Sequence, residues 1–324
     1  MKKKQNILII TPIRHIKDLY KRFINLGKIT YLPDPNIDEL LKLNKDIDVV
    51  FTNPNKSKIY LNKKIFNHFG NLKVICTAST GTVHINLNDA NEYGIKVISI
   101  SKEYKTLKRV SSTAELAFTL MLASLRNLVP SIQSVKQGEW DYEQFIGRQV
   151  NMLTIGIFGY GRLGKMFSSY CKAFGAKVVV YDPYVKVKDK HIKQVSNLRS
   201  LAKESDIISI HAHVSQETRE IFDKKIFNYF KDQFILINTS RGELIVEDDL
   251  IHHMKKNKNF KYATDVISDE TKNKKINTIF HNNLKNKYAN QLIITPHIGG
   301  MTSDAQFIAY NKAVDLLTNY LKKN

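Results

Sequence analysis

Residues 154–183 read TIGIFGYGRLGKMFSSYCKAFGAKVVVYDP, and this stretch decides the fold of the chain. The apolar runs 154–158 and 178–181 predict two strands, and the amphipathic stretch between them predicts a helix. Three glycines join the first strand to the helix: Gly159, Gly161 and Gly164. The first permits a tight turn, the second lets the backbone approach a diphosphate, and the third lets the helix pack close to the sheet. The stretch therefore predicts a βαβ unit that binds a dinucleotide.

Asp182 closes the second of these strands, 23 residues after Gly159. A carboxylate at this distance accepts hydrogen bonds from both ribose hydroxyls of NAD and repels the additional phosphate of NADP. Pro183 and Tyr184 follow, so neither Arg nor Lys stands directly behind Asp182 to bind that phosphate. The helix N-terminus behind the glycine turn adds unsatisfied N–H groups and a partial positive charge. We therefore predict NAD as the cofactor, against the alternative of an ordinary crossover without a ligand.

Apolar strands alternate with helical stretches in both halves of the chain, which predicts an α/β fold with mostly parallel sheets covered by helices. The expected strands of the first half are residues 6–13, 29–32, 47–52, 72–77 and 95–100, and the second half adds 206–212, 234–238, 262–266 and 291–295. The basic connector 101–109 is the expected crossing between the two halves.

Two helices are expected to begin with capping boxes: 112–127 with Ser112 and Glu115, and 303–321 with Ser303 and Gln306. The first is apolar nearly all round, so we expect it to be buried between two domains or at a subunit interface. The segment that follows it carries aromatic side chains for which packing is the expected role: Trp140, Tyr142 and Phe145.

The composition indicates a soluble globular chain of two domains, with 324 residues, 43% hydrophobic and 25% charged. The net charge of +20 comes mainly from lysines scattered along the sequence, without an arginine-rich stripe or an aromatic platform. We expect a solvated basic surface, no specific nucleic-acid partner and no membrane partner. The only two cysteines, Cys76 and Cys171, give neither a disulfide framework nor a metal site, so the cytoplasm is the expected compartment.

Three polar residues stand at the carboxyl ends of second-half strands, where open α/β sheets bind ligands: Arg241, Glu270 and His297. An arginine can grip the carboxylate of a 2-oxo acid in a bidentate manner and polarise its carbonyl group. A histidine can protonate the alkoxide as the nicotinamide gives a hydride to the carbon. A glutamate that accepts from the far ring nitrogen fixes the tautomer and favours the protonated imidazole. Taken singly, each also fits a surface or structural role.

With these motifs in order, the chain resembles the D-isomer-specific 2-hydroxyacid dehydrogenases, and most of all their phosphoglycerate dehydrogenase branch. The resemblance covers nearly the whole length and rests on STGTVHINLNDANEYGI, SSTAELAFTLMLASLRN, GIFGYGRLG, INTSRGELI, ATDVISDE and ITPHIGG. It implies two Rossmann-like domains with a cleft between them. A flavodoxin-like substrate domain would comprise residues 1–105 and 298–324, and an NAD-binding doubly wound parallel sheet would comprise 106–297. It also implies a homodimer joined through the cofactor domain.

The resemblance assigns roles to individual residues. Arg241, Glu270 and His297 match the catalytic residues, and Arg241 and His297 also contact the substrate. Amides of the loop after the fourth strand would hold the substrate carboxylate, at Ser79, Thr80 and Gly81. The implied cofactor contacts are Gly159, Tyr160, Gly161, Arg162, Leu163, Gly164, Asp182, His211, Ala212, Thr218, Thr239 and Asp265. No metal is implied.

The expected function is hydride transfer between NAD and a small D-2-hydroxy acid or its 2-oxo counterpart, with 3-phosphoglycerate as one candidate. Val83 replaces an acidic residue common in the substrate loop, and Lys56 and Lys58 offer charges for a substrate phosphate. A glyoxylate or hydroxypyruvate reductase and a sugar-acid reductase are therefore alternatives. From another class, the chain resembles the NAD(H)-sensing corepressors, which keep the same three catalytic residues.

Overall fold

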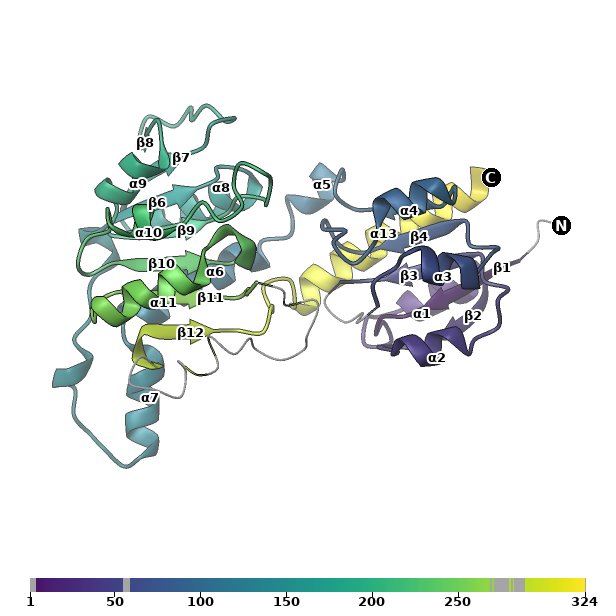
Figure 1. Ribbon diagram of the computed structural model, residues 1–324, viewed down its shortest axis with the longest axis horizontal. Coiled ribbons are helices and arrows are strands. Elements are labelled where there is room, and N and C mark those ends of the chain that lie inside the picture. Colours follow the sequence, from purple (N-terminus) through teal and green to yellow (C-terminus); the bar gives the residue numbers. More distant parts are fainter. Residues whose placement is uncertain are drawn as a thin grey trace. The chain divides into compact units, whose positions relative to one another are not determined.

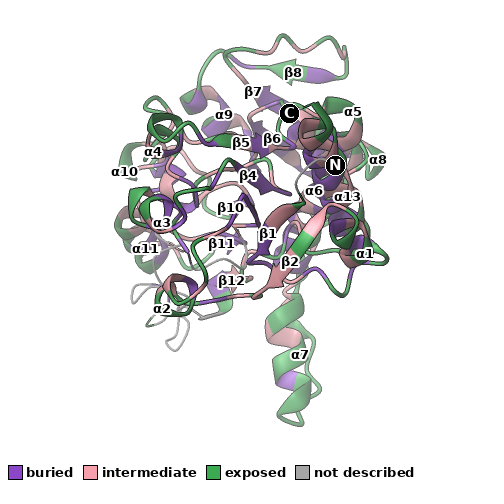
Figure 2. Cartoon of the chain, turned by 90° about the vertical axis from the view of Figure 1, so that its right-hand side faces the viewer, coloured by how far each residue is buried: buried purple, intermediate pink, exposed green. Residues whose placement is uncertain are grey.

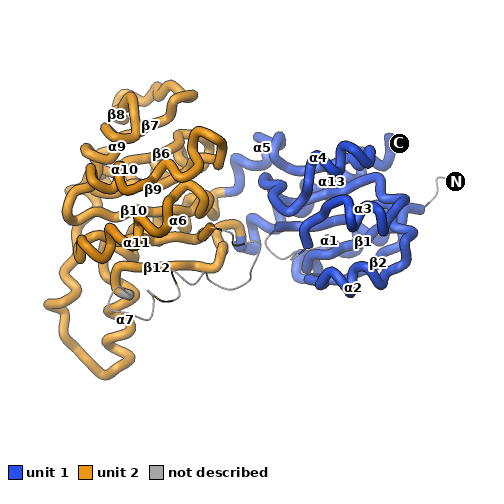
Figure 3. The backbone as a smooth tube through the Cα atoms, in the orientation of Figure 1, with its two compact units in different colours: residues 1–110, 301–324 blue, residues 111–300 orange. Residues whose placement is uncertain are grey.

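The computed structural model describes residues 4–54, 59–268, 270, 280, 282 and 289–323 (Figure 1). Lys56 and Lys58 lie outside the described residues. The chain divides into two compact units, residues 1–110 with 301–324 and residues 111–300 (Figure 3). No helix among the described residues is long and apolar enough to cross a membrane.

Unit 1 is built on a five-stranded parallel sheet in the order β2-β1-β3-β4-β5. Its strands are β1 (Gln5–Ile9), β2 (Gly27–Tyr31), β3 (Val49–Thr52), β4 (Val74–Thr77) and β5 (Lys96–Ser99). Its helices are α1 (Leu19–Ile24), α2 (Ile37–Leu41), α3 (Lys63–His68), α4 (Leu87–Glu92), α5 (Tyr104–Leu107) and α13 (Ser303–Lys323). Alternate residues of β1 enter two separate cores, Ile7 and Ile9 in one and Leu8 in the other, which Ile10 joins directly after the strand. The sheet is therefore covered on both faces, and the C-terminal helix α13 contributes Ala313 and Leu317 to the first core.

Unit 2 is built on a seven-stranded parallel sheet in the order β12-β11-β10-β9-β6-β7-β8. Its strands are β6 (Thr154–Phe158), β7 (Lys177–Tyr181), β8 (Ile192–Gln194), β9 (Ile207–Ile210), β10 (Ile235–Asn238), β11 (Lys261–Thr264) and β12 (Leu292–Ile294). Its helices are α6 (Ser112–Leu125), α7 (Leu128–Lys136), α8 (Arg162–Ala173), α9 (Leu198–Glu204), α10 (Lys224–Phe227) and α11 (Glu247–Lys256). The expected α/β class with parallel sheets is confirmed, and β8 is a strand that the sequence prediction missed.

Both predicted capping boxes are wrong. The N-cap of α6 is Ser111, whose hydroxyl bonds Glu115 at 2.5 Å and caps no backbone N–H. At the start of α13 the hydroxyl of Thr302 accepts from the N–H of Ala305 at 3.2 Å. In each case the residue at the start of the helix lies one position earlier than predicted, and the residue three positions after it is an alanine, Ala114 or Ala305, which cannot complete a capping box.

The aromatic residues of the 128–146 segment do not pack within the chain as predicted. Trp140 is 92% exposed and Tyr142 is 80% exposed, and only Phe145 is half-buried. The helix α7 before them is mostly exposed as well (Figure 2). By contrast, the predicted burial of α6 is confirmed, and it packs against α8 and strands β10 and β11 of its own unit. The predicted place of α6 between domains or at a subunit interface stays a prediction.

His84 makes unit 1 sensitive to acid. Its side chain is 4% exposed, and neither ring nitrogen has a hydrogen-bond partner in the part of the chain that the structure describes. Burial lowers the pKa of His84 to about 4. The folded state resists protonation of His84. The stability that depends on the neutral ring is therefore complete above the pKa of the histidine in the unfolded chain, near 6.5, and is lost as the pH falls toward about 4.

We expect the free energy of unfolding at pH 4.5 to be about 2–3 kcal/mol below its value at pH 7.5 on account of this histidine alone. His84→Leu removes the titrating group, so that part of the loss should disappear from urea unfolding curves at the two pH values. His191→Leu, at an exposed histidine, is the matched control. An unchanged acid loss in His84→Leu would contradict the prediction.

Candidate active site

The glycine turn after β6 has the steric demands that the sequence predicted. Gly159 has a φ of 93°, and a Cβ there would lie 2.8 Å from the amide nitrogen of Ala212. A Cβ at Gly164 would lie 2.1 Å from the carbonyl oxygen of Gly159, so the helix can approach the turn only with glycine at this position. A Cβ at Gly161 would meet nothing within 4 Å, so the space in front of this residue is open. The turn therefore keeps an open cradle in front of the first residues of α8.

The N-terminus of α8 faces this cradle. Gly161 is its N-cap and offers no side chain to satisfy the first helical N–H groups. Arg162 begins the helix, and burial lowers the pKa of its guanidinium below the ordinary value. Leu163 is half-buried and packs against the core of the unit. These residues fit the diphosphate of a dinucleotide, because the N-terminus of a helix favours an anion.

Asp182 connects the turn to the end of β7. Its Oδ2 accepts from the N–H of Tyr160 at 2.7 Å, and its Oδ1 accepts from the N–H groups of Tyr184 at 2.8 Å and Val185 at 3.0 Å. The side chain of Tyr160 is 8% exposed and packs in the core, so this residue turns its ring away from the cradle. Carboxylate oxygens have further lone pairs, so Asp182 retains acceptor capacity for a ribose.

Two buried polar atoms beside the turn lack a partner among the described residues. They are Nδ1 of His211 and Oγ1 of Thr239, which follow β9 and β10. Nε2 of His211 bonds the hydroxyl of Ser209 at 2.9 Å, and burial lowers the pKa of the imidazole to about 3, so the ring is neutral. Unpaired buried groups are costly unless a ligand or water completes them. The position of these atoms agrees with a bound cofactor at this edge of the sheet.

The loop after β9 continues from His211 and Ala212 to Thr218. The hydroxyl of Thr218 accepts from the N–H of Ser215 at 2.8 Å and donates to the carbonyl of His213 at 2.7 Å. Both bonds stay within the loop, so Thr218 holds the conformation of the segment that the sequence places over the cofactor.

Arg241 lies on the loop after β10, and Asn238 shapes that loop. The Nδ2 of Asn238 donates to the carbonyl of Arg241 at 2.9 Å, and its Oδ1 accepts from the N–H of Ser240 at 3.0 Å. The next residue, Gly242, is pressed against the loop after β11, because a Cβ there would lie 2.1 Å from the carbonyl carbon of Ile267. Nη1 of Arg241 donates to the carbonyl of Ser240 at 2.6 Å, which leaves most of the guanidinium donors for a ligand.

His297 lies on the turn after β12 and bonds Glu270 as predicted, with 2.6 Å between Nδ1 and the carboxylate. Both side chains are partly exposed, at 33% for His297 and 23% for Glu270. The bond occupies Nδ1 and leaves Nε2 as the nitrogen that can exchange a proton with a substrate. The pair has the arrangement of a general acid or base with its orienting carboxylate.

Asp265 fixes the unusual backbone of this histidine. His297 has a φ of 54°, a left-handed conformation that is uncommon for residues other than glycine. The Oδ1 of Asp265 accepts from the N–H of Ile298 at 2.8 Å and the hydroxyl of Thr295 at 2.5 Å, while Oδ2 accepts from the N–H of Gly299 at 2.7 Å. Burial raises the pKa of Asp265, and these bonds oppose that rise. The carboxylate of Asp265 thus holds the turn that carries His297, and its expected place near the nicotinamide stays a prediction.

The loop after β4 in unit 1 contains the predicted substrate residues. The hydroxyl of Ser79 donates to the carbonyl of Gly81 at 2.5 Å, Thr80 is exposed, and Val83 is 56% exposed. The loop is thus tied by its own serine, with its amides at the carboxyl edge of the unit 1 sheet.

In unit 2 the predicted residues gather at one edge of the sheet, because parallel strands bring their carboxyl ends together. Three residues that support the site were not predicted: Asn238, Ser240 and Thr295. Asn238 could have been predicted from its place before a turn, because the side-chain amide of an asparagine there often bonds the nearby backbone. Across the described ranges, no three or more histidine, cysteine, aspartate or glutamate side chains are grouped to hold a metal ion.

Comparison with known proteins supports the same reading. Residues 118–299, more than half of the chain, match the family model for the D-isomer specific 2-hydroxyacid dehydrogenase NAD binding domain. The chain is 32% identical over 269 residues to the hydroxypyruvate reductase of Thermotoga maritima, which covers 83% of each. It is 30% identical over 304 residues to the D-3-phosphoglycerate dehydrogenase of Methanocaldococcus jannaschii, covering 93% of this chain and 54% of that protein.

Among solved structures, the D-lactate dehydrogenase of Aquifex aeolicus, complexed with NAD and lactic acid, aligns with a TM-score of 0.81. It is 26% identical, and the alignment covers 98% of this chain and 96% of that one. The chain spans about half the length of the phosphoglycerate dehydrogenases it matches. With the glycine turn, Asp182 and the Glu270–His297 pair on one sheet, these matches show that the chain belongs to the D-isomer-specific 2-hydroxyacid dehydrogenases, NAD-dependent oxidoreductases that act on CH–OH groups.

Proposed function

We propose that this protein transfers a hydride between NAD and a small D-2-hydroxy acid or its 2-oxo counterpart, with Arg241, Glu270 and His297 as its catalytic residues. The observation that supports this most directly is the 2.6 Å bond between His297 and Glu270. The pair stands at the same sheet edge as the glycine turn and the Arg241 loop. A histidine oriented in this way suits proton transfer to an oxygen that gains charge.

In the direction of reduction, the carboxylate of the 2-oxo acid binds the guanidinium of Arg241. The hydride comes from the nicotinamide when NADH is bound. Nε2 of His297 donates its proton to the carbonyl oxygen as the carbon is reduced. Glu270 accepts from Nδ1–H throughout and stabilises the imidazolium before the transfer. In oxidation the same histidine takes the hydroxyl proton.

The substrate is a member of a short list of acids. The relatives' names point to hydroxypyruvate, 3-phosphoglycerate and glyoxylate, and the aligned lactate dehydrogenase adds pyruvate. We propose a small acid of this group, with 3-phosphoglycerate or its oxo form as one candidate and a sugar-derived 2-hydroxy acid as another. Val83 in the predicted substrate loop is exposed and apolar, so it offers no carboxylate to pair with a cationic group on the acid.

The test is a panel of these oxo acids, phosphorylated and not, with NADH consumption followed at 340 nm. Turnover of one acid well above the others would identify the substrate. NADH binding without turnover of any acid would instead favour the NAD(H)-sensing binding protein. Affinity for nucleic acid that falls steeply with salt would contradict the expectation that the basic surface is only solvated. We propose the cytoplasm as its compartment, since both cysteines are free thiols.

We further propose that the protein is a homodimer joined through unit 2. The segment 137–146, here called the arm, joins three exposed apolar side chains, Trp140, Tyr142 and Ile146, to three acidic ones, Glu139, Asp141 and Glu143. Monomeric proteins rarely leave such large apolar side chains in water. Before the arm, α7 exposes Leu128, Ile132 and Val135 as well.

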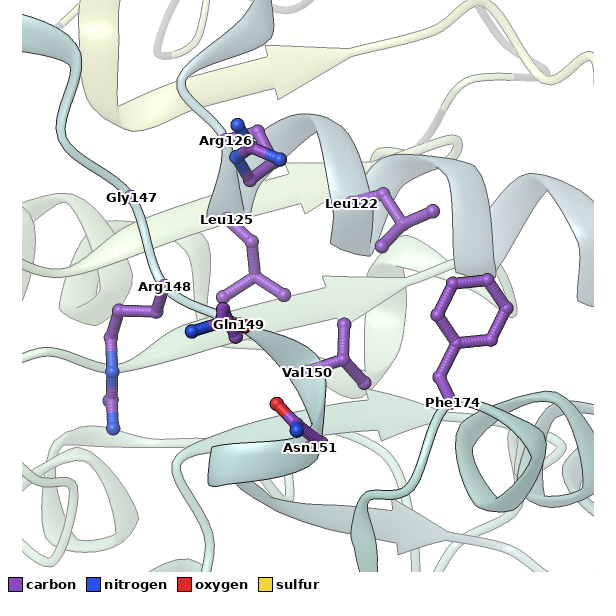
Figure 4. A pocket seen from close by; sticks show the side chains of 9 residues that line it. All are labelled: Leu122, Leu125, Arg126, Gly147, Arg148, Gln149, Val150, Asn151 and Phe174. Atoms are coloured by element: carbon purple, nitrogen blue, oxygen red, sulfur yellow. The ribbon is translucent and has the colours of Figure 1, made fainter.

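A cavity of about 590 Å³ at the base of the arm offers a complementary surface (Figure 4). Its wall is apolar with two guanidinium groups, and its lining residues are Leu122, Leu125, Arg126, Gly147, Arg148, Gln149, Val150, Asn151 and Phe174. An acidic, aromatic arm from a second copy matches the charge and polarity of this cavity. With a two-fold axis between the copies, the arm of each copy would bind the cavity of the other.

Trp140→Ala is expected to shift the protein from dimer to monomer at micromolar concentration, because a buried tryptophan is a typical interface anchor worth about 2–4 kcal/mol. Sedimentation velocity across a concentration series measures the shift. Tyr104→Ala, which removes a tyrosine that is 72% exposed in unit 1, is the control and should leave the dimer intact. A monomeric wild type would refute the dimer itself.

A further inference from the structure

A single side-chain bond joins the two loops that flank the glycine turn. The hydroxyl of Tyr184, in the loop after β7, donates to the carboxylate of Glu217, in the loop after β9. In the sheet, β6 lies between β7 and β9, and the glycine turn follows β6. The bond therefore passes in front of the carboxyl end of β6, on the side where Asp182 would receive the adenosine ribose.

Both ends of the bond stand on anchored backbone. Asp182 accepts from the N–H groups of Tyr184 and Val185 through one oxygen and from that of Tyr160 through the other. Thr218, next to Glu217, is tied to Ser215 and His213 within its own loop. The two side chains that meet are nonetheless exposed, with Tyr184 at 78%. They are thus not packing residues, and their effect must come from the bond and from the charge of Glu217.

We propose that Tyr184 and Glu217 form a strap that fixes the spacing of the two loops holding the adenosine half of NAD, and that the carboxylate of Glu217 assists Asp182 in excluding NADP. Fixing two loops before the ligand arrives lowers the ordering entropy lost on binding. A second carboxylate at the adenosine end raises the repulsion that the 2′-phosphate of NADP meets. The inference rests on cofactor binding at the glycine turn and not on the identity of the substrate.

The two roles separate in two variants. Tyr184→Phe removes the bond and keeps the ring and the charge, so the Kd for NADH should rise about three- to tenfold while the ratio of NADPH to NADH affinity stays constant. Glu217→Gln keeps an acceptor and removes the charge, so NADH binding should change little while NADPH binds about three- to tenfold more tightly. Glu204→Gln is the matched control, since it removes the carboxylate of the Lys193–Glu204 pair in the same unit. Neither the Kd for NADH nor the ratio of NADPH to NADH affinity should change in this variant.

Fluorescence titration with NADH and NADPH gives these dissociation constants without any turnover. A result against the Tyr184–Glu217 strap can therefore be told apart from a result against the proposed hydride transfer. ADP, which carries only the adenosine half, should show the same loss in Tyr184→Phe as NADH does. Glu217→Ala breaks the same bond as Tyr184→Phe, so in Tyr184→Phe/Glu217→Ala the loss for NADH should be no larger than the greater of the losses in Tyr184→Phe and Glu217→Ala alone. Strictly additive losses, an unaffected ADP, or a Glu217→Gln variant that still rejects NADPH would overturn the proposal.

Discussion

In the His297→Asn variant, oxo-acid reduction is expected to slow by about two to four orders of magnitude, the usual contribution of a positioned general acid. Asparagine removes the titrating imidazole yet tolerates the left-handed backbone that His297 adopts, with its φ of 54°. The turn held by Asp265 should therefore survive, and NADH affinity should stay unchanged. Stopped-flow reduction of the acid that the substrate panel selects, beside an NADH fluorescence titration, makes both measurements.

His191→Asn is the matched control for this variant, because His191 is an exposed histidine of the same unit. It should retain full turnover. If His297→Asn kept the wild-type rate, His297 would have no part in proton transfer. If it lost NADH binding together with turnover, the residue would serve the cofactor site and not the proton step.

Replacing Arg241 by glutamine should lower kcat/KM by about two to three orders of magnitude, because one member of a desolvated charge pair with the substrate carboxylate is lost. Glutamine has a side chain of similar reach but cannot form a bidentate ion pair. Most of the loss should appear as a higher KM for the acid, with a smaller fall in kcat from weaker polarisation of the carbonyl. Steady-state kinetics with the oxo acid as the varied substrate separates the two parameters.

Arg199→Gln serves as control, because Arg199 is exposed on α9 and stacks over Tyr229, 4.5 Å from the ring centroid. It should leave both parameters unchanged. An Arg241→Gln variant with a wild-type KM would show that the acid is bound elsewhere. Unchanged NADH binding in both variants confirms that the nucleotide site remains folded.

The glycine turn is the part of the site that the sequence predicted most fully. The φ of Gly159, the close approach of Gly164 to Gly159 and the open space at Gly161 all follow from steric needs that act within a few residues. The hydrogen bond between Glu270 and His297 was also predicted, although 27 residues separate the two. It could be predicted because both follow strands of one parallel sheet, whose carboxyl ends meet at one edge.

Other features depended on contacts that no local pattern records. The place of Asp265 beside the nicotinamide stays a prediction, and no pattern in the sequence indicated that its carboxylate accepts two backbone N–H groups of the turn that carries His297. Trp140 and Tyr142 were expected to pack, because large aromatic residues usually do, yet both are exposed within one chain. Burial depends on what lies opposite a side chain, and sequence pattern alone does not contain that information.

The sequence by itself determined the α/β class and the dinucleotide turn, and it predicted the role of Asp182 in selecting NAD and the residue types of the proposed catalytic group. These follow from periodicity, from glycine sterics and from side-chain chemistry, which are properties of residues close together in the chain. Only the tertiary structure decided that His297 takes a left-handed backbone under the hold of Asp265, and that Tyr184 meets Glu217 across the turn. Both depend on the order of strands in the sheet, which brings together loops that the sequence keeps about 30 residues apart.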